Sequence, residues 1–222
     1  TTHHLQPAAA PLHIHLGGGL GEGEITGPET HRQVTEEGLT VDPENRLWWR
    51  RGARRLDAEL IRDALLEVSG RLDRTMFGKG SLDQKSNRRS VYLTVKRGQL
   101  IPILQLFDAP DAMQGVGKRN ESTVAPQALV LLNSELVLDL ARGVVKRIQE
   151  TSFSKNIPAR VRQSWRLVLG RGPDDRELAE AITFLDEQAS RSTSDNDVDR
   201  ANDALLDLCH VLINTNEFLY VD

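Results

Sequence analysis

A run of apolar residues at helical spacing between Thr123 and Gln149 constrains the fold of this chain more than any other feature. Thr123 can accept a hydrogen bond from a first-turn amide, and Pro126 stands where a helix needs no backbone donor. Apolar side chains cover the whole circumference of the first turns, whereas the later charged residues fall on one stripe. The run therefore predicts one long central helix with an enclosed front half and a back half that faces water.

Four residues of this helix, Leu129, Leu136, Leu140 and Val144, are expected to line its inner face. Each such side chain removed from water stabilises a fold by roughly 1.5 to 3 kcal/mol, so Leu136→Asp should unfold the domain. Asn133 falls in the same apolar arc, where an unpaired amide would cost on the order of 1 to 3 kcal/mol. Its expected role is structural, through a hydrogen bond to a neighbouring loop, and a ligand contact is the alternative.

Two helices are expected before this one. Asp42-Pro43-Glu44-Asn45 has the composition of a helix start and predicts a short helix through Arg51. After Gly52, a second helix with Leu60 on its inner face should end at Gly70, which completes a helical hairpin.

Three amphipathic helices are expected after the central one, at residues 158–170, 177–189 and 198–213, the last with Ala201 turned inward. The apolar C-terminus should pack back on the domain. Alternation of β-branched and aromatic residues at 90–95 predicts a short strand. The expected fold class is mainly α: a single helical domain around a long central helix, with a minor short β element.

Residues 1–41 are rich in Gly and Pro without sustained apolar periodicity, which is typical of a flexible arm and leaves 42–222 as the helical domain. The glycine run 17–23 fails the phosphate-loop template in each register, because Glu22, Glu24 or Thr26 stands where the last glycine should be. Glu22 and Glu24 would also repel a phosphate. His13 and His15 would share one face of an extended segment and could grip a divalent metal. No carboxylate or cysteine stands at metal-site spacing beside them, so adventitious binding is the alternative.

The charge balance argues against several classes of partner. The 222 residues carry 28 Lys and Arg against 32 Asp and Glu, a formal charge of −4, so no global basic field indicates nucleic acid or an anionic membrane. No run approaches the roughly 18 apolar residues of a membrane span, and the N-terminus lacks the pattern of a secretory signal. Cys209 is alone, which excludes a disulfide framework and a CxxCH haem attachment in this chain. It should be a buried apolar residue, since the adjacent His210 points away from it.

The densest basic patch combines arginines with Trp48 and Trp49, and an anion-binding surface for nucleic acid or acidic glycan is one interpretation. The candidate residues are Arg46, Arg50, Arg51, Arg54 and Arg55. The alternative is solvated charge neutralised by nearby acids, which are Asp57, Glu59, Asp63 and Glu67.

Carboxylates on a turn make chemistry possible before the central helix. Asp108 and Asp111, with Glu121 next along, could act as acid and base or hold a hard cation. The structural alternative is that Asp108 and Asp111 bond the amides of their own turn and fix the start of the central helix.

Several phrases of the sequence occur together, in order, in one known family. They are Asp42 to Leu47, Arg55 to Glu59 with Val68 to Gly70, Arg89 to Tyr92, Phe107 to Asp111, Thr123 with Pro126 to Leu129 and Leu132 to Ser134, Leu167 to Arg171, and Leu208 to His210 with Asn214 and Asn216 to Asp222. Over about residues 42–222 the chain resembles the planctomycete-specific C-terminal domain of unknown function, the PSD-one or DUF fifteen-fifty-three family. Upstream, only Thr30 to Gln33 resembles a segment of that family, and its earlier half is absent.

The resemblance implies the last part of a large extracytoplasmic protein, often preceded by a cytochrome c-like domain and a second domain of unknown function. We therefore expect a non-catalytic structural or interaction module, with Asn214 and Asn216 as structural polar residues. No cofactor is expected in this chain, haem belonging to an upstream domain, and the expected partners are other domains of the same protein. The alternative function is an enzyme or redox-linked module acting on sulfated or other acidic polysaccharide.

Overall fold

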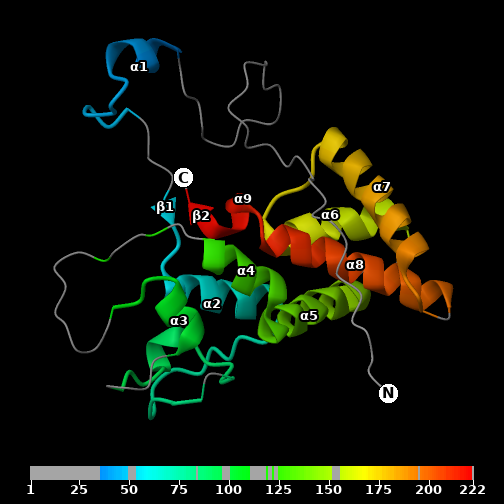
Figure 1. Cartoon of the computed structure of the whole chain (residues 1–222), viewed down its shortest axis with the longest axis horizontal. Coiled ribbons are helices and arrows are strands. Elements are labelled where there is room, and N and C mark those ends of the chain that lie inside the picture. The colour runs from blue at the N-terminus through cyan, green and yellow to red at the C-terminus, as the bar shows by residue number, and fades with distance from the viewer. Residues whose placement is uncertain are drawn as a thin grey trace, which may run out of the picture.

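The computed structural model describes residues 36–49, 54–83, 85–96, 101–110, 119, 122, 125–151, 156–194 and 196–221. In chain order its elements are α1 (Glu36–Val41), β1 (Arg54–Arg55), α2 (Ala58–Val68), η1 (Ser90–Tyr92), α3 (Pro102–Leu106), α4 (Ala125–Asn133), α5 (Glu135–Thr151), α6 (Ile157–Val168), α7 (Asp175–Arg191), α8 (Asp197–Ile213), α9 (Asn216–Leu219) and β2 (Tyr220–Val221). Figure 1 shows α5 to α8 gathered on one side, α2 to α4 beside them, and α1 apart. The predicted mainly α fold with a minor β element is confirmed.

The core lies where α8 packs against α5, α6 and α7. Leu205, Leu208 and Leu212 of α8 are almost completely buried, and Cys209 between them is fully buried, as predicted. The three C-terminal amphipathic helices are also confirmed, although Ala201 faces solvent rather than the core. Among the described residues, no helix is both long and apolar enough to cross a membrane.

The predicted central helix is two helices, α4 and α5, separated at Ser134. Leu140 and Val144 of α5 are buried as expected and Leu136 is half-buried, but Leu129 of α4 is 56% exposed. The prediction for Leu129 was wrong because the break shifts the phase of the helical faces. The 100° repeat of α5 does not continue into α4, whose buried face carries Leu131 instead.

Asn133 ends α4 on the solvent side, which corrects its predicted place in the apolar arc. Its side-chain Nδ2 donates to the Leu129 carbonyl oxygen at 2.9 Å, within its own helix and not to a neighbouring loop. Its role is therefore local and structural, at the point where α4 ends.

The predicted helical hairpin does not form. Instead of starting a helix, Asp42 follows α1 and organises a turn: its Oδ2 accepts from the Leu47 amide at 2.7 Å, and its carbonyl accepts from Trp49 Nε1 at 2.8 Å. Asn45 and Trp48 have φ of 56° and 58°, left-handed values that a right-handed helix through this segment cannot contain. Residues 50–53 lie outside the described residues. The second helix of the pair, α2, is confirmed up to Gly70 at φ 74°, although Leu60 is exposed.

The strand predicted at 90–95 begins instead as the 3-10 helix η1. Asp63 of α2 explains this, since its Oδ1 accepts from both the amide and the hydroxyl of Ser90 at 2.7 Å. This tertiary contact takes the backbone donor that a strand would use for a ladder.

The β element joins two ends of the described domain. β1 and β2 pair antiparallel with Arg54 opposite Val221 and Arg55 opposite Tyr220, and the Leu56 amide donates to the Leu219 carbonyl at 2.8 Å. We call this pairing the terminal clasp. It confirms that the C-terminus packs back on the domain, and Figure 1 shows β1, the strand that contains Arg55, at the edge of the helical body.

Candidate functional site

Four polar residues far apart in the sequence meet behind the terminal clasp. We call them the Arg55 cluster: Arg55 on β1, Asp108 just after α3, Ser122 just before α4, and Gln127 within α4. Each comes from or borders a phrase shared with the resembled family. Asp108 can turn toward the cluster because its φ is 62°, a left-handed conformation that Asp tolerates better than most residues.

Arg55 is the centre of the cluster, with 7% of its side chain exposed. Its Nη2 donates to Asp108 Oδ2 at 2.8 Å and to the Phe107 carbonyl at 3.2 Å. Its Nη1 donates to Gln127 Oε1 at 3.0 Å and also to the Ser122 carbonyl, while the guanidinium lies 5.5 Å from the centre of the Phe107 ring. A buried cation is tolerated only with such partners. Arg55 is thus engaged inside the fold, unlike the surface anion-binding residue that the sequence suggested.

The carboxylate of Asp108 is likewise occupied by hydrogen bonds within the fold. Besides Arg55, its carboxylate accepts from the Ser122 amide and hydroxyl, both at 2.8 Å. Burial alone would raise the pKa of Asp108, but the hydrogen bonds from Arg55 and Ser122 outweigh it and hold the pKa below its usual range. Asp108 therefore stays ionised at neutral pH, which does not suit a general acid. It bonds Ser122, fourteen positions on, and among the described residues it bonds no amide of its own turn, so it links α3 to the start of α4.

A second ion-pair network adjoins the cluster through α2. Arg119 donates to both carboxylate oxygens of Glu59 at 2.8 Å and lies 3.6 Å from Asp57. Asp57 also accepts from Arg54 at 3.4 Å. The hydrogen bond from Arg119 lowers the pKa of Glu59. Two of the acids predicted to neutralise the arginine patch thus lie here. Asp57 pairs with Arg54, and Glu59 pairs with Arg119.

A third network ties α6, α7 and α9 together. Arg171, after α6, donates from Nη1 to Glu177 at 2.7 Å and from Nε to Glu217 at 2.6 Å. Glu177 also closes a capping box with Asp174 at the start of α7. Burial raises the pKa of Glu177, but the bonds from Arg171 and the Asp174 amide prevail and lower it.

Most of the remaining predicted site residues lie outside the part of the chain that the structure describes. Asp111, Glu121, Arg50, Arg51, His13 and His15 lie outside the described residues, so the catalytic, anion-binding and metal hypotheses that name them stay predictions. Arg46 makes an exposed ion pair with Glu44 at 2.6 Å. Asn214 follows α8 and donates from Nδ2 to the His210 carbonyl at 2.8 Å, and Asn216 begins α9.

Sequence reasoning missed Ser122 and Gln127, although one signal was available. Gln127 is buried four residues before Leu131, so a polar side chain stands on the inner face of α4 and requires a partner. The hydroxyl of Ser122 and the Leu106 carbonyl both accept from its Nε2, at 3.2 and 3.0 Å.

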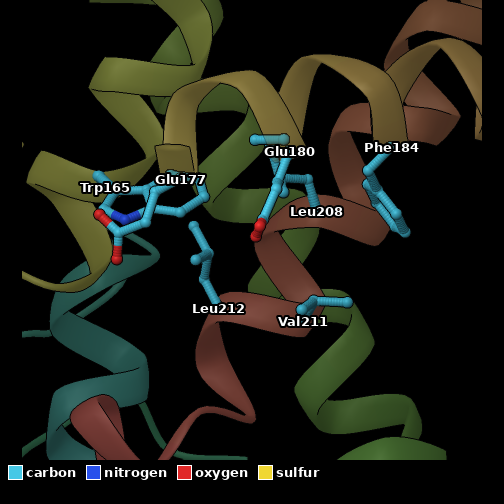
Figure 2. Close-up of a pocket in the computed structure, with 8 residues that line it drawn as sticks. Trp165, Glu177, Glu180, Phe184, Leu208, Val211 and Leu212 are labelled. Carbon is cyan, nitrogen blue, oxygen red and sulfur yellow. The ribbon is translucent and has the colours of Figure 1, made fainter. Parts of the chain in front are cut away.

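A cavity between α6, α7 and α8 is too small for a ligand. Figure 2 shows Trp165 and Glu177 at one end of it and Phe184 at the other, with Leu208 and Leu212 between them. Its volume is about 10 Å³, which is room for about one water molecule. Among the described residues, no three His, Cys, Asp or Glu side chains are grouped so that they could hold a metal ion.

Fold and site together define a class of protein. It is a helical module in which the polar residues of the Arg55 cluster hold the module's own segments in place. The chain belongs to the PSD1 family, proteins of unknown function (DUF1553), which it matches over residues 25–185. The match begins within the segment predicted to be an arm and ends in α7. Comparisons with curated proteins and with solved structures gave no match.

Proposed function

We propose that this chain is a non-catalytic structural and interaction module of a longer extracytoplasmic protein. It occupies the C-terminal part of that protein and works beside other domains of the same polypeptide, one of which is a cytochrome c-like domain that carries the haem. The four hydrogen bonds that the Arg55 Nη atoms give to Phe107, Asp108, Ser122 and Gln127 support this proposal most directly. The polar groups that the family phrases contribute are used to hold β1, α3 and α4 together.

A catalytic role on acidic polysaccharide is less well supported by the same geometry. A general acid must be able to hold a proton near the operating pH, and an anion site needs a guanidinium with donors free to reach the ligand. Asp108 is held ionised by Arg55 and Ser122. Both Nη atoms of Arg55 donate to protein oxygens, and its Nε, which has no partner among the described residues, is buried and so not open to a ligand on the surface.

A direct test compares Asp108→Asn with the matched surface variant Asp139→Asn on a sulfated polysaccharide. We expect no new reducing ends from the wild-type chain or from either variant. Product formed by the wild type and by Asp139→Asn, but lost in Asp108→Asn, would identify an enzyme and overturn the proposal.

The interaction role needs its own measurement. The chain and the remaining domains of the same polypeptide, produced separately, should bind one another in calorimetric titration. A flat titration at all accessible concentrations, with both pieces folded by circular dichroism, would argue against an intramolecular docking module.

A further inference from the structure

The segment between α2 and α3 is strongly basic, although the whole chain is acidic. We call residues 71–96 the basic loop; they contain seven Lys or Arg and two Asp, in a chain of net charge −4. The basic residues are Arg71, Arg74, Lys79, Lys85, Arg88, Arg89 and Lys96. Such a local excess creates a positive field on one part of the surface.

The described part of this loop is fixed by hydrogen bonds although it has little regular structure. Arg62 of α2, with a side chain 3% exposed, donates to the Arg88 carbonyl at 3.0 Å and to Ser90 Oγ at 3.1 Å. Arg88 in turn donates to the carbonyls of Thr75 and Lys79, and lies 3.9 Å from the centre of the Tyr92 ring. A surface held in this way loses little conformational entropy when a partner binds.

The outer surface of the basic loop combines exposed apolar residues with cations. Phe77 is 79% exposed and Val91 71%, with Met76 and Val95 also exposed. The amide of Phe77 donates to the Tyr92 hydroxyl at 2.8 Å, which places the two halves of the loop side by side. The cations Lys79, Lys85, Arg89 and Lys96 are exposed and form no ion pair among the described residues, although Lys85 lies near enough to Asp139 to help lower the pKa of that carboxyl. Apolar side chains surrounded by charged residues are typical of a protein interface. Because the charged residues here are positive, the partner surface must be acidic.

A complementary surface exists on the same chain at the turn between α7 and α8. We call five exposed residues there the acidic tip: Asp186 and Glu187 on α7, and Asp197, Asp199 and Asp203 on α8. Arg191 and Arg200 pair with Glu187 and Asp197, at 3.6 and 2.6 Å. Among the described residues, the other three acids form no ion pair.

The two surfaces cannot neutralise each other within one molecule. The basic loop lies at one end of the molecule, below α2 and α3 in Figure 1, and the α7–α8 turn lies at the opposite end. We propose that the basic loop binds the acidic tip of a second copy of this chain. The contact joins different surfaces, so it repeats head to tail and forms rings or open chains. This inference goes beyond the proposed function and does not depend on it.

Sedimentation velocity of the whole chain tests the proposal. In about 0.1 M salt the weight-average mass should rise with protein concentration, and in about 1 M salt, where the Debye length falls to about 3 Å, the association should weaken more than about tenfold. The double variant Lys79→Glu and Lys85→Glu should stay monomeric at the lower salt. The matched control, Arg162→Glu and Arg166→Glu on the exposed side of α6, makes the same charge change elsewhere and should associate like the wild type.

A charge-swapped pair makes the test specific for the two surfaces. The variant Asp186→Lys and Glu187→Lys should be monomeric alone, and mixing it with Lys79→Glu and Lys85→Glu should restore association. Circular dichroism and the urea midpoint establish that each variant is folded. A wild type that stays monomeric, or an association that survives either double variant, would overturn the proposal. Binding of heparin through Lys79 and Lys85 without self-association would also overturn it, in favour of an anionic polymer.

Discussion

Replacing Asp108 tests whether the Arg55 cluster holds the fold together. Asp108→Ala leaves Arg55 buried without its carboxylate and removes the acceptor of two Ser122 donors. Breaking a buried ion pair costs about 3–5 kcal/mol, and an Ala at φ 62° adds about 1 kcal/mol. Asp108→Asn tolerates that φ and keeps one acceptor oxygen, so its cost should be about 2 kcal/mol.

The matched control is Asp139→Ala. Its ion pair with Arg71 is partly exposed, at 37% and 48% of the two side chains, so the loss should be no more than about 1 kcal/mol. Urea unfolding followed by far-UV circular dichroism gives the three free energies of unfolding, provided that the slopes agree. Equal losses for Asp108→Ala and Asp139→Ala would refute the view that the cluster is a structural clamp.

Acid pH gives an independent check on the same residue. The folded-state pKa of Asp108 is lowered, so its contribution to stability is present above the unfolded value of about 3.9 and is lost as the pH falls through the folded value. The stability difference between the wild type and Asp108→Asn should therefore shrink below about pH 4. A difference that stays constant down to the acid unfolding of the wild type would mean that the carboxylate charge is not what stabilises the cluster.

Three further predictions concern other parts of the chain. Desolvation of the carboxyl, with a smaller contribution from the neighbouring Asp203, raises the pKa of Asp207, although the residue is exposed. Its contribution to stability is lost as the pH rises through the folded value, so Asp207→Asn should raise the urea midpoint slightly at neutral pH and leave it unchanged below about pH 4. A Cβ on Gly143 would meet the Ser69 carbonyl oxygen at 2.8 Å, so Gly143→Ala should lower the free energy of unfolding by about 1–3 kcal/mol, whereas Gly172→Ala, with open space around it, should not. Burial raises the pKa of Cys209 to about 12, so a thiol reagent should label it only after denaturation, and rapid labelling of the native chain would contradict its burial.

Local sequence signals predicted the helix ends that carry capping residues or a terminal glycine. The α7 start carries a capping box between Asp174 and Glu177, and the α2 end is followed by Gly70 in the left-handed conformation. Such signals act within a few residues, so they can be read without knowledge of the fold. The break at Ser134 carries no comparable signal, and the apolar pattern of α4 and α5 was therefore read as one helix.

Two of the four members of the Arg55 cluster were predicted from the sequence, but the contact between them was not. Arg55 and Asp108 were both singled out, yet the bond between them spans 53 positions and depends on how β1 and α3 pack. The same limit explains the strand predicted at Ser90, because Asp63 of another element decides its backbone conformation. Tertiary contacts of this kind override local propensity.

The terminal clasp also determines how the domain would respond to mechanical load. Its strands are antiparallel, with Arg54 opposite Val221, so a force that draws the chain outward on both sides would peel the hydrogen bonds apart one after another. Peeling needs less force than shearing all of them at once, and it would leave the helices intact. After the strands separate, the force would act on Arg55. Its hydrogen bonds to Asp108 and Gln127 would have to break before the force reached the core.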